Sequence, residues 1–301
     1  MSQGGSRRVV LVALAANLGI SLAKLAAALV THSGSMLAEA IHSFADSGNQ
    51  GLLLVGDARA SRPASERYPM GYGREAYFWA LLVAVLLFTM GGAFSAYEGV
   101  HKLLEPEPIH HVGWALAVLG VSVVLEGLSF RAAWGEVNRV RGRKHLFGWA
   151  RETGDVNLLV VAFEDLAALM GLALALMAVL LTWITGDPLY DAVGSCLIAA
   201  LLFYVAVFLG SQVRRLITGH TVGPELREAL EGVWQAHGFH VLRLVAVWAG
   251  PHQMTVATKV CPKDQSVSAA VLIDQMNAAE RAVRERVPEV TMQFSEPDQE
   301  D

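Results

Sequence analysis

Residues 37–55 read Leu-Ala-Glu-Ala-Ile-His-Ser-Phe-Ala-Asp-Ser-Gly-Asn-Gln-Gly-Leu-Leu-Leu-Val, an apolar stretch with ionisable residues where a membrane helix normally has none. His42 and Asp46 are four residues apart, so on a helix both side chains project from one face, one turn apart. Burying an ionisable group at bilayer depth costs about 2.5–3.5 kcal/mol, which a chain tolerates when the group pairs, faces water or binds an ion. Either residue alone could be a packing residue or a helix cap. Together they form half of a divalent-metal site.

The composition is that of a membrane protein with a soluble tail. The 301 residues are 53% hydrophobic and 17% charged, whereas soluble domains are about 25% charged. Long stretches carry almost no charge, while the tail is ordinary in composition. The net charge of −5, without a basic patch that interleaves aromatic residues, argues against nucleic acid as a partner. Cys196 and Cys261 lie too far apart, in contexts too different, to predict a disulfide or a metal motif.

Six stretches are long enough, at about 20 apolar residues, to cross a bilayer. They are predicted at residues 9–30, 34–56, 77–103, 112–135, 156–184 and 189–212. Nearly all basic residues of the short loops fall on one side, and the other side has Lys102 alone. The basic side is cytoplasmic by the positive-inside rule, which places both termini in the cytoplasm. We therefore expect an integral protein of the cell (inner) membrane, with residues 1–215 as a six-helix transmembrane domain.

Residues 216–301 show the alternating patterns of a compact α+β domain. Apolar residues at helical spacing after Pro224 predict a first helix. Two strands, a second helix and a third strand are predicted at residues 240–248, 254–260, 272–283 and 290–294. The order αββαβ predicts a ferredoxin-like cytoplasmic domain with both helices on one face of the sheet.

The fifth predicted span carries a second acidic spot at the depth of the first. Asp46 lies about 16 Å into its span from the outside and Asp165 about 14 Å into its own from the inside, so both fall near the midplane. Two antiparallel helices with acids at one level can share a site, as in secondary transporters. Glu164 points about 100° away from Asp165 around the helix. We expect Asp165 to be a ligand, and Glu164 either to ligate or to pair with a buried donor such as Arg131. Asn157 shares the face of Asp165.

With these residues the chain resembles the cation diffusion facilitator family, six-span antiporters that exchange divalent metals for protons and carry a cytoplasmic metallochaperone-like domain. The resemblance covers nearly the whole chain. It rests on His42-Ser-Phe-Ala-Asp46, Tyr68-Pro-Met-Gly-Tyr-Gly-Arg74, Tyr97-Glu-Gly99, Asp165 six residues before Gly171, and Asp191-Ala-Val-Gly-Ser195. The stretches 42–50 and 164–168 are most similar to the branch that contains the human zinc transporter nine group.

The resemblance implies a transport site with two ligands from the second span and two from the fifth, each pair four residues apart. His42 and Asp46 match the first pair, and Asp165 matches one ligand of the second. Its partner position falls on Val161, which cannot bind a metal ion. The fourth ligand is then Glu164, or water, or a side-chain amide from Asn49, Gln50 or Asn157. One histidine with two or three carboxylates suits Zn²⁺, and Mn²⁺, Fe²⁺ and Co²⁺ follow as alternatives.

These features predict a transporter rather than an enzyme, without a bound cofactor. We expect export of a divalent transition metal, with Zn²⁺ favoured, from the cytoplasm by alternating access and coupled to inward proton flow. Ligands must lose protons to bind metal, so metal and protons compete, and His42 is the group that changes charge near neutral pH. The resemblance implies a homodimer held by the soluble domain.

Two other functions could use the same residues. A non-transporting membrane metal sensor or scaffold is kept open by Val161. An intramembrane hydrolase could use His42 and Asp46 at a metal, but the chain has no HExxH motif.

Two regions in which relatives bind additional metal look different here. The loop Glu66–Gly73 contains no histidine, so we predict that this extra site is absent. The tail histidines match no ligand spacing and are interpreted as solvated side chains: His220, His237, His240 and His252.

Overall fold

The structure is a computed structural model that describes residues 10–12, 14–15, 17–23, 25–26, 34–105 and 112–299, with the backbone alone at 34–43, 45, 114 and 115. The first predicted span, 9–30, therefore lies partly outside the described residues, and the described ones within Val10–Ala23 are helical. The side chain of His42 also lies outside the description.

Four helices of the described chain are long and apolar enough to cross a membrane, which confirms four predicted spans. They are the continuous rod Glu75–Leu104, most of α5 (Val112–Arg141), α7 (Val156–Thr185) and α8 (Leu189–Ile217). Helix α2 (Gly34–Ala60) covers the predicted second span and is 27 residues long. It is not among those four, because polar residues such as Asp46 and Asn49 interrupt its apolar sequence.

The rod contains a π-helical turn that the sequence did not predict. Here η1 (Leu87–Ala93) joins α3 (Glu75–Leu86) to α4 (Phe94–Leu104). Glycines let this rod approach α8 closely: a Cβ atom on Gly92 would lie 2.7 Å from the ring of Phe203, and one on Gly99 would lie 2.7 Å from the Sγ atom of Cys196. Small residues at such crossings are typical of membrane helix packing.

The tail folds in the predicted order αββαβ. The elements are α9 (Pro224–Ala236), β1 (Phe239–Gly250), β2 (Gln253–Pro262), α10 (Ala269–Arg286) and β3 (Val290–Pro297). Strand β2 lies in the middle, antiparallel to β1 and parallel to β3. Helix α9 begins at Pro224, as predicted, because proline is tolerated at the first helical position.

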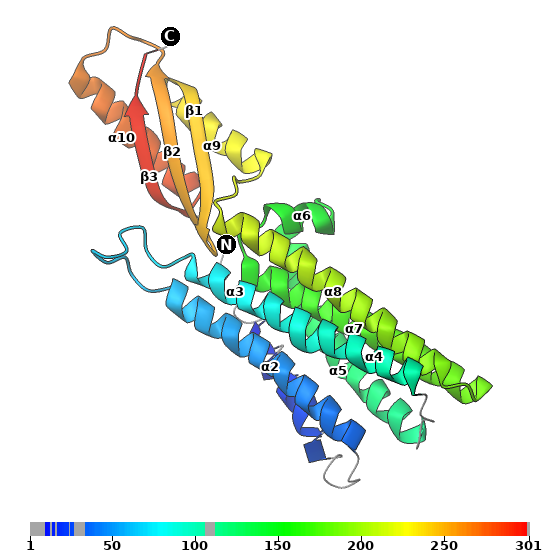
Figure 1. The fold of residues 1–301 in the computed structure, drawn as a ribbon. Coiled ribbons are helices and arrows are strands. Elements are labelled where there is room, and N and C mark those ends of the chain that lie inside the picture. Colours follow the sequence, from blue (N-terminus) through cyan, green and yellow to red (C-terminus); the bar gives the residue numbers. More distant parts are fainter. Residues whose placement is uncertain are drawn as a thin grey trace.

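Helices α9 and α10 cover one face of this sheet and leave the other open (Figure 1). Trp234 of α9, Phe239 of β1 and Met254 of β2 are fully buried between the helices and the sheet. On the open face, Val245, Ala257 and Phe294 are neighbours across the three strands, and Phe294 is 54% exposed.

The sheet domain extends from the end of the bundle at which α3 and α7 begin (Figure 1). The last turns of α2, α5 and α8 at this end carry the basic residues Arg59, Arg139, Arg141, Arg214 and Arg215. A short helix that the sequence did not predict, α6 (Leu146–Glu152), lies between α5 and α7. Trp248 near the end of β1 packs against both the core of the bundle and the core of the sheet domain.

Candidate metal centre

The side chain of Glu164 is held between two amides of α2. Asn49 donates from Nδ2 to Oε1 of Glu164 at 2.8 Å, and Gln50 donates from Nε2 to Oε2 at 3.1 Å. All three side chains are buried, Gln50 completely. Of the two roles expected for Glu164, the described conformation shows pairing with a buried donor. The donors are Asn49 and Gln50, whereas Arg131 is exposed.

A third helix joins this contact through Gln50. The Nδ2 atom of Asn17 donates to Oε1 of Gln50 at 3.2 Å, so both ends of the Gln50 amide are engaged. Asn17 is 4% exposed and lies in the first helical segment. A hydrogen-bonded chain thus crosses from the first helix through α2 to α7. Such interhelical bonds hold membrane helices together where the lipid supplies no hydrophobic driving force.

Asp165 is positioned by a different helix. The Oγ atom of Ser129 on α5 donates to Oδ2 of Asp165 at 2.9 Å, and both residues are 2% exposed. The two adjacent acids of α7 therefore point to different neighbours, Glu164 to α2 and Asp165 to α5. This is the divergence expected from two consecutive positions on a helix.

Asp46 of α2 belongs to the same cluster of charges. It is half-buried, and its carboxylate is close enough to interact electrostatically with both Glu164 and Asp165. Glu126 of α5 interacts electrostatically with Glu164 as well. The structure thus places Asp46 within electrostatic range of Glu164 and Asp165, and it adds Glu126 to the group. The metal-ligand roles of Asp46, Glu164 and Asp165 stay predictions.

Three residues of this region escaped the sequence analysis: Asn17, Glu126 and Ser129. The sequence does contain a pattern that points to two of them. Glu126 and Ser129 are polar residues three positions apart within the predicted fourth span. That spacing places both on one face of a helix. Asn17 offers only a single amide in an apolar run.

Two buried amide oxygens of α2 and α7 have no hydrogen-bond partner among the described residues. They are Oδ1 of Asn49 and Oδ1 of Asn157, and both side chains are at least nine-tenths buried. Buried polar atoms are nearly always paired, so these two oxygens are available to a ligand. Val161, where the family pattern expects a ligand, is completely buried in the apolar core.

The donor set fits a divalent transition metal as substrate. The carboxylates of Asp46, Glu164 and Asp165 and the amide oxygen of Asn49 are contributed by α2 and α7, and the backbone of α2 carries His42 one turn before Asp46. Among the described side chains, no three of His, Cys, Asp and Glu are close enough to hold an ion. Ligation would therefore use His42, whose side chain is not described, or a rearrangement of the acids.

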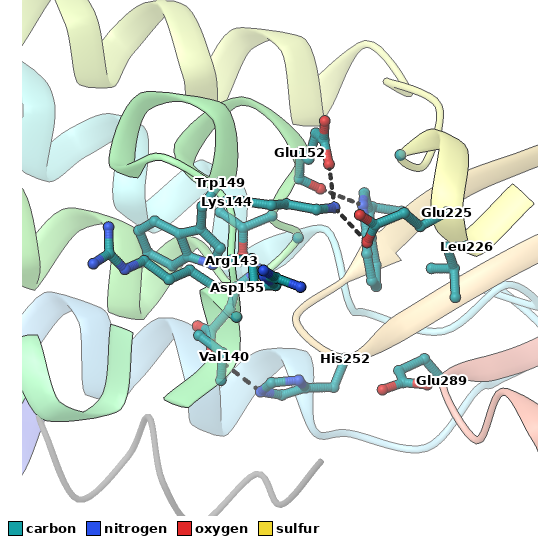
Figure 2. Close-up of a pocket in the computed structure, with 16 residues that line it drawn as sticks. Val140, Arg143, Lys144, Trp149, Glu152, Asp155, Glu225, Leu226, His252 and Glu289 are labelled. Atoms are coloured by element: carbon teal, nitrogen blue, oxygen red, sulfur yellow. Dashed lines mark hydrogen bonds and ion pairs between the residues drawn. The ribbon is translucent and has the colours of Figure 1, made fainter. Parts of the chain in front are cut away.

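A separate cavity of about 680 Å³ lies between the bundle and the sheet domain. Its wall includes Lys144, which bridges Oε2 of Glu152 at 2.6 Å and Oε2 of Glu225 at 3.1 Å (Figure 2). Burial works to lower the pKa of Lys144, but the hydrogen bonds with Glu152 and Glu225 outweigh it and raise that pKa. Lys144 therefore links the loop after α5 to both α6 and α9.

The same cavity contains an ion pair between the two domains. His252, in the turn between β1 and β2, places Nε2 3.2 Å from Oδ2 of Asp155, the residue before α7. Asp155 raises the pKa of His252 above its ordinary value, against the opposing effect of burial. The side chain of His252 is 17% exposed, so its interpretation as a solvated histidine is wrong.

The other tail histidines have separate surroundings. A ring nitrogen of His220 contacts Arg215, Nδ1 of His237 lies 2.8 Å from the carbonyl oxygen of Val233, and His240 is exposed. The described tail therefore does not gather its histidines into one cluster.

Comparison with known proteins places these features in a family. The chain matches the family model described as the cation efflux transmembrane domain over residues 10–217. It is 34% identical over 252 residues to the mitochondrial proton-coupled zinc antiporter SLC30A9 of Homo sapiens, covering 82% of this chain and 44% of that protein. It is 31% identical to metal tolerance protein C4 of Arabidopsis thaliana (72% and 48% covered) and 30% identical to a probable cation efflux system protein of Mycobacterium tuberculosis (74% and 63% covered). The chain thus spans less than half the length of the first two relatives.

Proposed function

The chain belongs to the cation efflux family, a family of membrane transporters, and we propose that it exports a divalent transition metal from the cytoplasm in exchange for protons. Zn²⁺ is the favoured substrate, because the human relative is a proton-coupled zinc antiporter by name. The observation that carries the proposal is that Asp46 on α2 interacts electrostatically with both Glu164 and Asp165 on the antiparallel helix α7.

We assign the ligands of this site to His42, Asp46 and Asp165. Glu164 is a ligand only if it exchanges one of its amide donors for the ion, since Asn49 and Gln50 occupy both of its oxygens. Two amide oxygens, Oδ1 of Asn49 and Oδ1 of Asn157, could bind the ion without giving up a hydrogen bond to a described residue. Gln50 is the weakest candidate, because both ends of its amide are engaged.

The coupling to protons follows from competition at these ligands. A carboxylate or imidazole that holds a proton cannot hold the metal, so metal binding releases protons and protonation releases metal. Alternating access then needs a rocking of helices that exposes the site first to one side and then to the other.

The remaining architecture of the proposal agrees with the described residues. Six spans with both termini in the cytoplasm fit the basic residues at the end of the bundle that carries the sheet domain. We propose the cell (inner) membrane as the location. We infer a transport domain over residues 1–215 and a ferredoxin-like, metallochaperone-like domain over 216–301. The open sheet face with Val245 and Phe294, 42% and 54% exposed, is the surface that a homodimer would cover.

The decisive experiment is metal flux into proteoliposomes under a pH gradient. We expect Asp46→Ala and Asp165→Ala each to abolish Zn²⁺ transport. Asp274→Ala, which changes an exposed acid of α10, should leave it at the level of the parent. Transport by both site variants at the parental rate would show that this site is not the transport site.

The same assay separates the alternatives. Transport of Mn²⁺, Fe²⁺ or Co²⁺ in preference to Zn²⁺ would identify an exporter of another metal with the same site. Tight metal binding without flux would identify a membrane metal sensor or scaffold, the alternative that Val161 keeps open.

A further inference from the structure

The hydroxyl group of Ser129 makes a contact unlike that of other hydroxyls in these helices. Serine and threonine in a helix usually donate to the carbonyl oxygen three or four residues earlier. Ser21, Thr89, Thr185, Ser195 and Thr218 all do so. Ser129 instead donates across to another helix, from Oγ on α5 to Oδ2 of Asp165 on α7 at 2.9 Å.

This hydrogen bond is buried, and its acceptor is a carboxylate. Both residues are 2% exposed, so water does not compete for the bond. Hydrogen bonds to a carboxylate are stronger and more directional than those between neutral groups. The hydroxyl therefore fixes the rotation of the Asp165 carboxylate and engages Oδ2, and Oδ1 is the oxygen that Ser129 does not use.

We propose that Ser129 is a specificity-determining residue, which positions Asp165 as a one-oxygen ligand and so favours Zn²⁺ over ions of higher coordination number. The inference rests on the proposed function, because it takes Asp165 to be a metal ligand. Zn²⁺ prefers four ligands in a tetrahedron. Mn²⁺ prefers about six oxygen ligands, a number that a carboxylate binding through both oxygens helps to reach.

Removal of the Ser129 hydroxyl should lower the preference of the site for Zn²⁺. In Ser129→Ala, Asp165 loses its donor and can rotate to offer both oxygens. Loss of a residue that orients a ligand typically costs about 10- to 100-fold in metal affinity. We expect Zn²⁺ binding to weaken by such a factor and Mn²⁺ binding to weaken much less, so that the preference for Zn²⁺ over Mn²⁺ falls.

The test uses the full chain, purified in detergent and titrated with Zn²⁺, Mn²⁺ and Co²⁺ against a chelating indicator. Ser129→Thr keeps the hydroxyl and should keep the parental preference. Ser122→Ala is the matched control, since it removes an equally buried hydroxyl from the same helix, seven residues away. The visible spectrum of bound Co²⁺ is a second measurement, because four-coordinate Co²⁺ absorbs far more strongly than six-coordinate Co²⁺.

The outcomes distinguish this inference from the proposed function. A lower preference for Zn²⁺ and a weaker Co²⁺ spectrum in Ser129→Ala, both restored in Ser129→Thr, support it. Parental values in Ser129→Ala overturn it, and so does a Ser129→Thr protein that behaves like the alanine variant. If Ser129→Ala does not fold, Ser129→Val, which matches the shape of threonine but has no hydroxyl donor, takes its place under the same criteria. Metal binding of parental affinity in Asp165→Ala instead overturns the proposed site itself.

Discussion

At the scale of single residues, glycine marks where the two domains meet. A Cβ atom on Gly154 would lie 2.4 Å from the ring of Trp248, and one on Gly73 would lie 2.5 Å from the carbonyl oxygen of Ala249. Trp248 also donates from Nε1 to the carbonyl oxygen of Glu152 at 3.1 Å. The tip of the β1–β2 hairpin is therefore in direct contact with the residues that precede α3 and α7.

The contact at Gly154 predicts the effect of one methyl group. Gly154→Ala forces the Trp248 ring away, and overpacking of this kind typically costs about 1–3 kcal/mol. We expect a lower midpoint of thermal unfolding, followed by tryptophan fluorescence in detergent. Gly148→Ala is the control, because it lies inside α6 and a Cβ atom there meets nothing within 4 Å. It should leave stability unchanged or raise it by up to about 1 kcal/mol. Equal midpoints for the two variants would contradict the close contact.

At the scale of elements, Glu164 holds α2 against α7. In Glu164→Ala the donors of Asn49 and Gln50 lose their shared acceptor inside the bundle. A buried donor without a partner costs about 1–3 kcal/mol. We expect Glu164→Ala to unfold at a lower temperature than the parent in the absence of metal, and Glu164→Gln, which keeps one acceptor oxygen, to fall between them. An alanine variant as stable as the parent would mean that these bonds do not hold the two helices together.

The elements were more predictable than the contacts between them. The apolar runs at 77–103, 156–184 and 189–212 predicted α3–α4, α7 and α8, because a membrane span needs a fixed length of apolar sequence. Pro224 marked the start of α9. The partners of Glu164 and Asp165 depend on how helices rotate against each other, and sequence spacing does not fix this rotation. Ser129 was missed because a helix serine usually bonds its own backbone.

At the scale of the whole molecule, the hairpin tip connects the sheet domain to the transport helix. Asp155 accepts at Oδ1 from the backbone N–H of Leu158, so it caps the start of α7, while its Oδ2 pairs with His252. Helix α7 carries Asp165 farther along. The hairpin tip is therefore joined directly to the first turn of the helix that bears the candidate site.

This ion pair should make the docking of the domains depend on pH. Asp155 and Glu289 both raise the pKa of His252, and burial opposes them without reversing the shift. A pKa raised in the folded state stabilises the protein fully below the unfolded value of about 6.5, and the stabilisation is lost as the pH rises through the raised pKa. Docking should therefore be tightest in mildly acidic solution.

His252→Asn tests this dependence without a change in backbone strain. His252 has a φ of 56°, and asparagine is among the residues that tolerate this region. At pH 6 we expect the parent to have a higher midpoint of thermal unfolding than the variant. The difference between the two midpoints should narrow as the pH rises, because the imidazole of the parent then loses its charge and asparagine has no charge to lose. His240→Asn, at an exposed position of β1, should show no such pH-dependent gap. A gap between parent and His252→Asn that stays constant from pH 6 to pH 9 would mean that His252 contributes by packing alone, and that the ion pair does not link the sheet domain to α7.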